Sequence, residues 1–168
     1  MKYIASIGFL ILLSGCATKE QIAYYLPQTA LQNGVQSKHI SPLSVESASY
    51  LASDKIWYYK EGVFLPYQRS FMAKLPGEYI RERLESSVST GRFSLAVSVR
   101  DAYQLYGQQH YFVLKTHVLL SHGGTVIHEK DIDVNVSCGM GPAEAVRGFS
   151  QAVDELCRLI DIYIRSIR

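Results

Sequence analysis

The sequence predicts a single layered α/β domain of the α+β type, in which a mixed, mainly antiparallel sheet is packed by two main helices. Residues 93–99 alternate strictly between apolar and polar side chains, which is typical of a half-buried strand. Residues 103–121 and 125–136 are two long β runs separated by a glycine-containing turn. Two further stretches repeat apolar residues every three to four positions, and such helices bury their apolar face on a sheet.

The first residues of the sequence predict an export signal. Met1-Lys2 is a short positive region, and residues 4–12 are apolar but too few to span a bilayer. The following Leu13-Ser14-Gly15-Cys16 resembles the lipobox of bacterial lipoproteins, in which small residues precede a cysteine. We therefore predict that residues 1–15 are a lipoprotein signal peptide that is removed. The alternative is an ordinary signal peptide with an incidental cysteine.

Cys16 is the predicted lipidation site, where an N-acyl chain and an S-diacylglycerol group would be attached. Three acyl chains hold a protein on a membrane far more strongly than one chain does. Ala17 follows, whereas the inner-membrane retention residue of enterobacteria is Asp. The expected location is the periplasmic face of the outer membrane, with the inner membrane as the alternative. Residues 16–21 are then the lipidated cysteine and a tether, and residues 22–168 are the domain.

Four strands are expected in the amino-terminal half of the domain. Residues 22–27 and 39–45 each contain a proline, which ends the first strand and places the second at an edge or a bulge. Residues 55–60 and 63–67 flank Glu61-Gly62, a two-residue hairpin signal.

The first expected helix opens at Pro76-Gly77-Glu78, because proline is tolerated in the first turn and an acidic residue is favourable there. Its apolar face is Leu75, Tyr79, Ile80, Leu84 and Val88. The second helix follows Gly139-Met140-Gly141-Pro142 and extends for six or seven turns. Its apolar stripe is Ala145, Val146, Phe149, Val153, Leu156, Ile160, Tyr163 and Ile167.

The composition restricts the partners. The formal net charge is +2 and the basic residues are scattered, which argues against nucleic acid. The chain has 12 tyrosines, and β-propensity explains them better than a dedicated binding stripe. Cys138 and Cys157 could form a disulfide in an oxidising compartment, although two free thiols are slightly favoured.

No constellation of residues predicts catalysis. We find no nucleophile elbow and no phosphate-binding glycine loop, and Asp131 and Asp133 lie on a solvated strand face. His128 with either aspartate could imitate part of a metal site, but a third ligand is missing. We expect no enzyme activity, no metal and no cofactor apart from the lipid on Cys16. The histidines, expected to be structural, are His39, His110, His117, His122 and His128.

Several short motifs carry a family resemblance through their order and spacing. They are Tyr24-Tyr25-Leu26-Pro27, Ile56-Trp57-Tyr58-Tyr59, Leu65-Pro66-Tyr67, Leu75-Pro76 and Thr90-Gly91-Arg92-Phe93, followed by a long hairpin and a terminal helix. In this order they resemble the ABC-type transport auxiliary lipoproteins, the PqiC-like proteins that accompany MCE and MlaE-type lipid transport systems. The resemblance covers most of the chain after Cys16.

The resemblance implies a non-catalytic periplasmic subunit that works with an MCE-domain protein and an ABC permease and ATPase in intermembrane phospholipid transport. The expected contact residues are aromatic and lie on the hairpin, although burial in the core explains them equally well. They are Trp57, Tyr58, Tyr59, Phe64 and Tyr67. The alternatives are a pilotin-like lipoprotein of an envelope assembly or secretion complex, and a carrier that holds lipid in its own cavity. A homo-oligomer is also left open.

Overall fold

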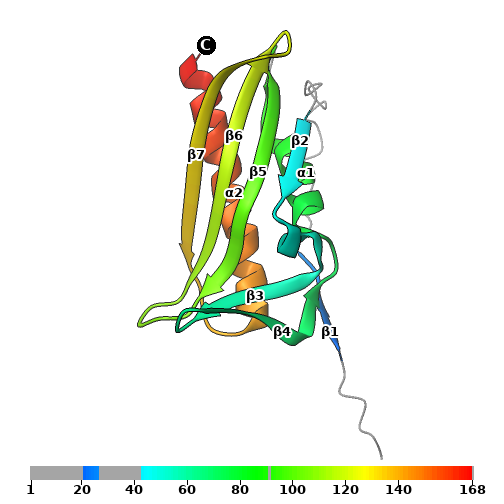
Figure 1. Cartoon of the computed structure of the whole chain (residues 1–168), viewed down its shortest axis with the longest axis vertical. Coiled ribbons are helices and arrows are strands. Elements are labelled where there is room, and N and C mark those ends of the chain that lie inside the picture. The colour runs from blue at the N-terminus through cyan, green and yellow to red at the C-terminus, as the bar shows by residue number, and fades with distance from the viewer. Residues whose placement is uncertain (1–20, 27–42, 91, 168) are drawn as a thin grey trace, which may run out of the picture.

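The computed structural model describes residues 21–26, 43–90 and 92–167. The predicted signal peptide, Cys16 and all but the last residue of the tether lie outside these residues. The described chain is a single α+β domain with a seven-stranded mixed sheet and two main helices, which confirms the predicted fold class (Figure 1).

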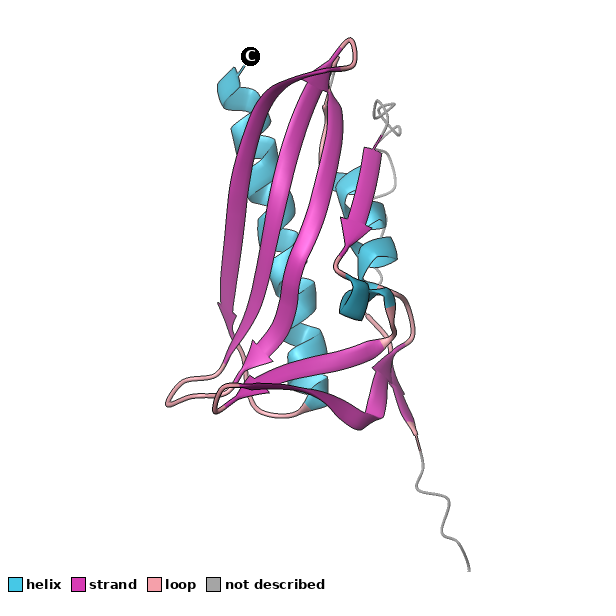
Figure 2. Cartoon of the chain, viewed as in Figure 1, coloured by secondary structure: helices cyan, strands magenta, loops and turns pink. Residues whose placement is uncertain are grey.

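Both helices lie on the same side of the sheet, behind the strands in Figure 2, and the other side is open. The sheet order is β1-β4-β3-β5-β6-β7, with β2 paired to β5 outside this path. A 3-10 helix spans Ser49–Ala52. The elements are β1 (Ile22–Tyr24), β2 (Leu43–Ser47), β3 (Lys55–Lys60), β4 (Val63–Met72), α1 (Pro76–Ser87), β5 (Ser94–Leu105), β6 (Tyr111–His122), β7 (Thr125–Ser137) and α2 (Pro142–Ile167).

One edge of β5 is shared by two parallel strands in succession. β2 pairs with residues 95–99 of β5, and β3 pairs with Gln104 and Leu105 further along. β1 pairs in parallel with β4, whereas the long β5–β6 and β6–β7 ladders and the β3–β4 hairpin are antiparallel. The hairpin therefore crosses one end of the long strands (Figure 1).

Both predicted hairpin turns are present. Glu61 and Gly62 have φ values of 52° and 87°, and Gly123 and Gly124 have φ values of 58° and 83°. Two successive residues with positive φ match the right-handed twist of the flanking strands, so these turns reverse the chain without splaying it.

The predicted run over residues 103–121 is wrong as a single strand. β5 continues past residue 99 to Leu105, the chain turns through Gly107, and β6 begins at Tyr111. The turn closes on the pairing of Leu105 with Tyr111, and its Gly107-Gln108-Gln109 stretch is exposed. A bulge between Val99 and Asp101 shifts the pairing of β5 with β6 by one residue, and β5 continues beyond the expected seven residues.

The core lies between the sheet and the two helices. The hydrophobic residues of α2 that are at most 1% exposed are Ala145, Phe149, Ala152, Val153, Leu156, Ile160 and Ile164. α1 buries Tyr79, Ile80 and Leu84 beside it, and the Tyr79 hydroxyl is 2.9 Å from Ser150 Oγ of α2. Leu75 was expected on this apolar face, but it precedes the helix and is 37% exposed.

Cys138 and Cys157 are free thiols, as the sequence slightly favoured. A Cβ atom added at Gly148 of α2 would lie 3.2 Å from Cys138 Cβ. Cys157 is nine residues further along the same helix, roughly 13 Å at 1.5 Å per residue. Because a disulfide needs Cα atoms within about 7 Å, these two cysteines cannot pair in this fold.

Candidate functional site

The β3–β4 hairpin carries all five aromatic residues predicted as contact residues. Side chains alternate along a strand, so Trp57 and Tyr59 point to one side of the hairpin and Tyr58 points to the other. Phe64 pairs with Tyr59, and Tyr67 packs on Tyr58 with ring centroids 4.7 Å apart. The five residues therefore belong to two separate clusters.

The open-face cluster continues the open side of the sheet and consists of Tyr50, Trp57, Tyr59, Phe64 and Tyr103. The Phe64 ring lies 4.8 Å from Tyr59 and 4.9 Å from Tyr103, the latter in a T-shaped contact. Tyr50 meets Trp57 edge-on at 5.4 Å. Offset and edge-to-face contacts of this kind stabilise aromatic side chains beyond their buried area.

The inner cluster lies on the other side of the hairpin, beside the start of α2, and consists of Tyr58, Tyr67, Tyr106 and His110. Gln104 is fully buried against it. Its Oε1 accepts a 2.5 Å hydrogen bond from the Tyr67 hydroxyl, and its Nε2 donates a 2.5 Å hydrogen bond to the carbonyl of Gly139. The hairpin is thereby tied to the loop that precedes α2.

Burial raises the pKa of several of these hydroxyls. It raises the pKa of Tyr50 to about 12, and the Tyr50 hydroxyl donates to Asp101 Oδ1 at 3.1 Å. Burial, followed by the hydrogen bond with Tyr106, raises the pKa of Tyr67, and burial also raises the pKa of Tyr103. The Tyr50 and Tyr67 hydroxyls both donate hydrogen bonds, to Asp101 and to Gln104 respectively.

The five predicted contact residues differ in how much of each side chain is exposed. Phe64 is 44% exposed, whereas Trp57, Tyr58, Tyr59 and Tyr67 are half-buried in the clusters. The Trp57 ring is held by packing, and its Nε1 is buried without a hydrogen-bond partner. Phe64 is therefore the residue of this set with most surface available to a partner.

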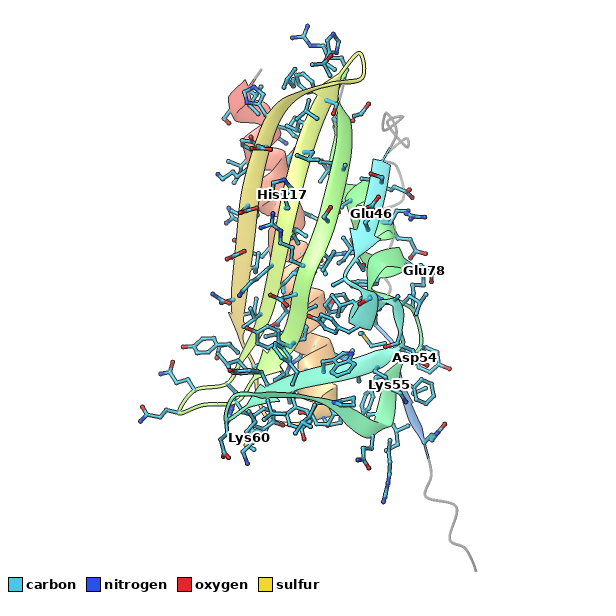
Figure 3. The ribbon with its side chains drawn as sticks, viewed as in Figure 1. Glu46, Asp54, Lys55, Lys60, Glu78 and His117 are labelled. Carbon is cyan, nitrogen blue, oxygen red and sulfur yellow. The ribbon has the colours of Figure 1, made fainter. Side chains whose placement is uncertain are left out.

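The open face also carries a group of charged residues that the sequence did not predict. His117 of β6, labelled in Figure 3, lies directly opposite Asp131 of β7, with His117 Nδ1 2.6 Å from Asp131 Oδ1. Arg100 approaches the same carboxylate at 3.2 Å. The hydrogen bond from His117 is the main cause that holds the pKa of Asp131 below its usual range. Only the β6–β7 register brings these residues together, and a pattern along one strand does not show it.

The suspected His128 and aspartate group does not assemble. His128 packs against Tyr163 of α2, with ring centroids 6.4 Å apart, while Asp131 faces the open side of the sheet. Within residues 21–26, 43–90 and 92–167, no three His, Cys, Asp or Glu side chains are grouped to hold a metal ion. His39 lies outside the described residues.

The interior beneath the hairpin is filled. A cavity of about 10 Å³ is lined by Ile56, Met72, Phe112 and Phe149, among others. In the described part of the chain, no helix combines the length and hydropathy needed to cross a bilayer.

No family model matches the chain, and no curated protein matches it. Among solved structures, the chain is similar to a Xanthomonas campestris protein of family DUF330, with 16% sequence identity and a TM-score of 0.66, over 85% of this chain and 95% of that one. It is also similar to an uncharacterized protein, with 17% identity and a TM-score of 0.69, over 87% and 99% of the two chains. These similarities show a shared fold across nearly the full length of both neighbours.

Proposed function

We propose that this protein is a periplasmic lipoprotein, anchored through Cys16, that serves as a non-catalytic contact subunit of a phospholipid transport system. Its partners would be an MCE-domain protein and the ABC permease and ATPase of that system. The lipobox and the ordered motifs that resemble the auxiliary lipoproteins support this proposal. Ala17 after the cysteine favours the periplasmic face of the outer membrane as the site of attachment.

The exposed edge of the open-face cluster is the observation that carries the contact role. Phe64 is held by Tyr59 and Tyr103 and is still 44% exposed. A rigid, partly exposed aromatic side chain is typical of residues that anchor protein interfaces. We therefore place the partner protein on the open face of the sheet around Phe64.

The interior argues against a carrier that holds lipid within its own domain. Ligand pockets have volumes of roughly 300–1,000 Å³. The cavity of about 10 Å³ between the sheet and α2 is far smaller, and its walls are core side chains such as Phe149. A contact role fits the described residues better than storage of an acyl chain.

A photo-crosslinking amino acid in place of Phe64 tests the partner. Irradiated cells should yield an adduct with the MCE-domain protein, because the side chain at this position reaches the proposed interface. The matched control is the same probe at Arg81, an exposed residue of α1, and it should yield no such adduct. Recovery of secretin or outer-membrane assembly proteins instead, without MCE or permease subunits, would contradict the transport role.

Substitution of the cysteine tests the anchor. Cys16→Ala removes the thiol that receives diacylglycerol, so we expect the chain to lose incorporation of labelled palmitate and to leave the membrane fraction. Cys138→Ala is the control and should retain both, because Cys138 is a half-buried thiol in the folded domain. Palmitate incorporation that persists in Cys16→Ala would show that the lipid is attached elsewhere.

A further inference from the structure

The tip of the β3–β4 hairpin exposes apolar side chains on the side opposite the open-face cluster. Val63 is 51% exposed and Leu65 is 40% exposed. The register places Lys60 opposite Val63 and Tyr58 opposite Leu65, so all four side chains share one side of the hairpin.

Met140 extends this surface. It is 62% exposed, and the two glycines that flank it are hydrogen-bonded to Gln104 and Tyr106. Tyr106 packs on Tyr58 with ring centroids 5.3 Å apart, so the loop and the hairpin are continuous. We define the hairpin-tip surface by its exposed members, which are Lys60, Val63, Leu65 and Met140.

The composition of the hairpin-tip surface fits the boundary between lipid headgroups and acyl chains. Aliphatic side chains enter this boundary, and lysines reach lipid phosphates. The Lys60 ammonium lies 3.6 Å from Glu61 in an exposed ion pair. Exposed pairs of this kind contribute little, so Lys60 remains available to a phosphate.

The described chain begins at the same end of the molecule as the hairpin (Figure 1). Ile22, where β1 begins, is six positions after Cys16, and an extended chain of that length spans at most about 20 Å. β1 pairs with residues 70–72 of β4, at the other end of that strand from Val63 and Leu65, and both β1 and β4 lie at the lower end of the molecule in Figure 1. A lipid on Cys16 therefore holds the hairpin end of the domain near the membrane.

The other exposed apolar tip lies at the opposite end. Val126 and Ile127 adjoin the β6–β7 turn, which Figure 1 shows at the far end of the long strands from β3 and β4. β6 has 12 residues, which is roughly 40 Å at 3.3 Å per residue. A membrane that contacts the hairpin-tip surface cannot also contact Val126.

We propose that the hairpin-tip surface rests on the phospholipid bilayer that holds the anchor, with Val63, Leu65 and Met140 in the headgroup region and Lys60 at a lipid phosphate. The inference rests on the lipid anchor of the proposed function. It adds a second membrane contact that fixes the orientation of the domain and leaves the open face to the partner protein.

Photo-labelling of the full lipidated chain tests this contact. The chain is placed in vesicles of phosphatidylethanolamine and phosphatidylglycerol that contain a phospholipid with a diazirine in its acyl chain. After irradiation and trypsin digestion, we expect lipid adducts on peptides 61–69 and 131–147, which hold Val63, Leu65 and Met140. Peptide 116–130, which holds Val126 and Ile127, should carry several-fold less label.

Two variants separate the sides of the hairpin. Val63→Glu combined with Leu65→Glu should lower the labelling of peptide 131–147 several-fold, because two carboxylates keep the tip away from the bilayer. Phe64→Glu is the matched control on the opposite side of the same strand and should leave that labelling unchanged. Both variants should stay attached to the vesicles through the lipid.

The result also separates this inference from the proposed function. If mass spectrometry finds the lipid on Cys16 but peptides 61–69 and 131–147 are unlabelled, or peptide 116–130 is labelled equally, the membrane contact is wrong and the anchored subunit stands. If Cys16 is unmodified, both proposals fail.

Discussion

At the scale of single residues, a buried amide fixes the hairpin against the start of α2. Gln104 occupies one position of β5, it is fully buried, and both ends of its side chain are hydrogen-bonded. Its neighbours Tyr67 and Gly139 come from segments on either side of β5 in sequence. A glutamine in an alternating strand is by itself only a polar position, so the sequence did not predict this role.

Gln104→Leu should therefore destabilise the fold. The carbonyl of Gly139 would lose its donor inside the protein, and an unsatisfied buried polar group costs about 1–3 kcal/mol. Urea denaturation followed by circular dichroism measures the change in the free energy of unfolding. Gln108→Leu, in the exposed β5–β6 turn, is the control and should change it by less than about 0.5 kcal/mol. Equal effects of the two substitutions would rule out the proposed role of the amide.

The histidine of the open face should control its neighbouring carboxylate. His117→Ala removes the hydrogen bond that is the main cause of the lowered pKa of Asp131, so that pKa should rise toward its usual range. Arg100→Ala should raise the pKa of Asp131 less, because its charge is a smaller cause. Carboxyl carbon NMR titration measures both. If the pKa of Asp131 rises more in Arg100→Ala than in His117→Ala, then Arg100 and not His117 is the main cause of the lowered pKa.

At the scale of elements, local signals predicted the turns and helices well, whereas pairing across the sheet depended on distant partners. Glu61-Gly62 and Gly123-Gly124 specify their hairpins through residues that accept positive φ, and Pro76 opens α1 as expected. The β5–β6 turn was missed because Gly107-Gln108-Gln109 interrupts a long β-prone run for only three residues. Nothing local in β2 indicates that it adds in parallel to β5.

The close approach of α2 to β6 provides a test at this scale. A methyl group added in Gly148→Ala would meet Phe112 Cβ at 2.7 Å and Cys138 Cβ at 3.2 Å. Alanine in place of glycine usually stabilises a helix by about 1 kcal/mol, but overpacking of a core costs about 1–3 kcal/mol. We expect a lower melting temperature for Gly148→Ala and little change for Gln151→Ala, an exposed position on the same helix. A higher melting temperature for Gly148→Ala would show that α2 and β6 are not tightly packed.

At the scale of the whole molecule, the domain buries acidic groups that are neutral at physiological pH. Burial raises the pKa of Tyr50 and of the Cys157 thiol to about 12, and it also raises the pKa values of Tyr67, Tyr103 and Cys138. In the unfolded chain these groups ionise at lower pH than in the folded domain. Their contribution to stability is therefore complete below their ordinary pKa values and is lost as the pH rises through the folded values.

The free energy of unfolding should accordingly fall between about pH 9, where an unfolded thiol ionises, and about pH 12. Urea denaturation at a series of pH values measures the slope. Tyr50→Phe cannot ionise at this position and should show a shallower fall over the upper part of the range. A slope that is unchanged in Tyr50→Phe would exclude this tyrosine as a contributor.

In the candidate site, as in the fold, the sequence did not predict contacts between residues that are far apart in the chain. The aromatic residues of the hairpin were identified from composition and motif order, but their division into two clusters follows from strand alternation together with the positions of Tyr50, Tyr103 and Tyr106. The contact between His117 and Asp131 needs the β6–β7 register. Residues that are near in space but far apart in sequence leave no pattern in a single chain.

The shared edge of β5 has a consequence for how the protein is made. β2 and β3 precede β5 in the chain, and the structure gives β2 no other strand partner among the described residues. During synthesis, the ribosome produces β2 and β3 before β5, the strand with which both of them pair. Among the described residues, β2 therefore has no strand partner until β5 has been translated, whereas β3 can already pair with β4. The later β5–β6–β7 meander pairs strands that are adjacent in sequence, so it can form early. β2 and the β3–β4 hairpin can then pair with the free edge of β5.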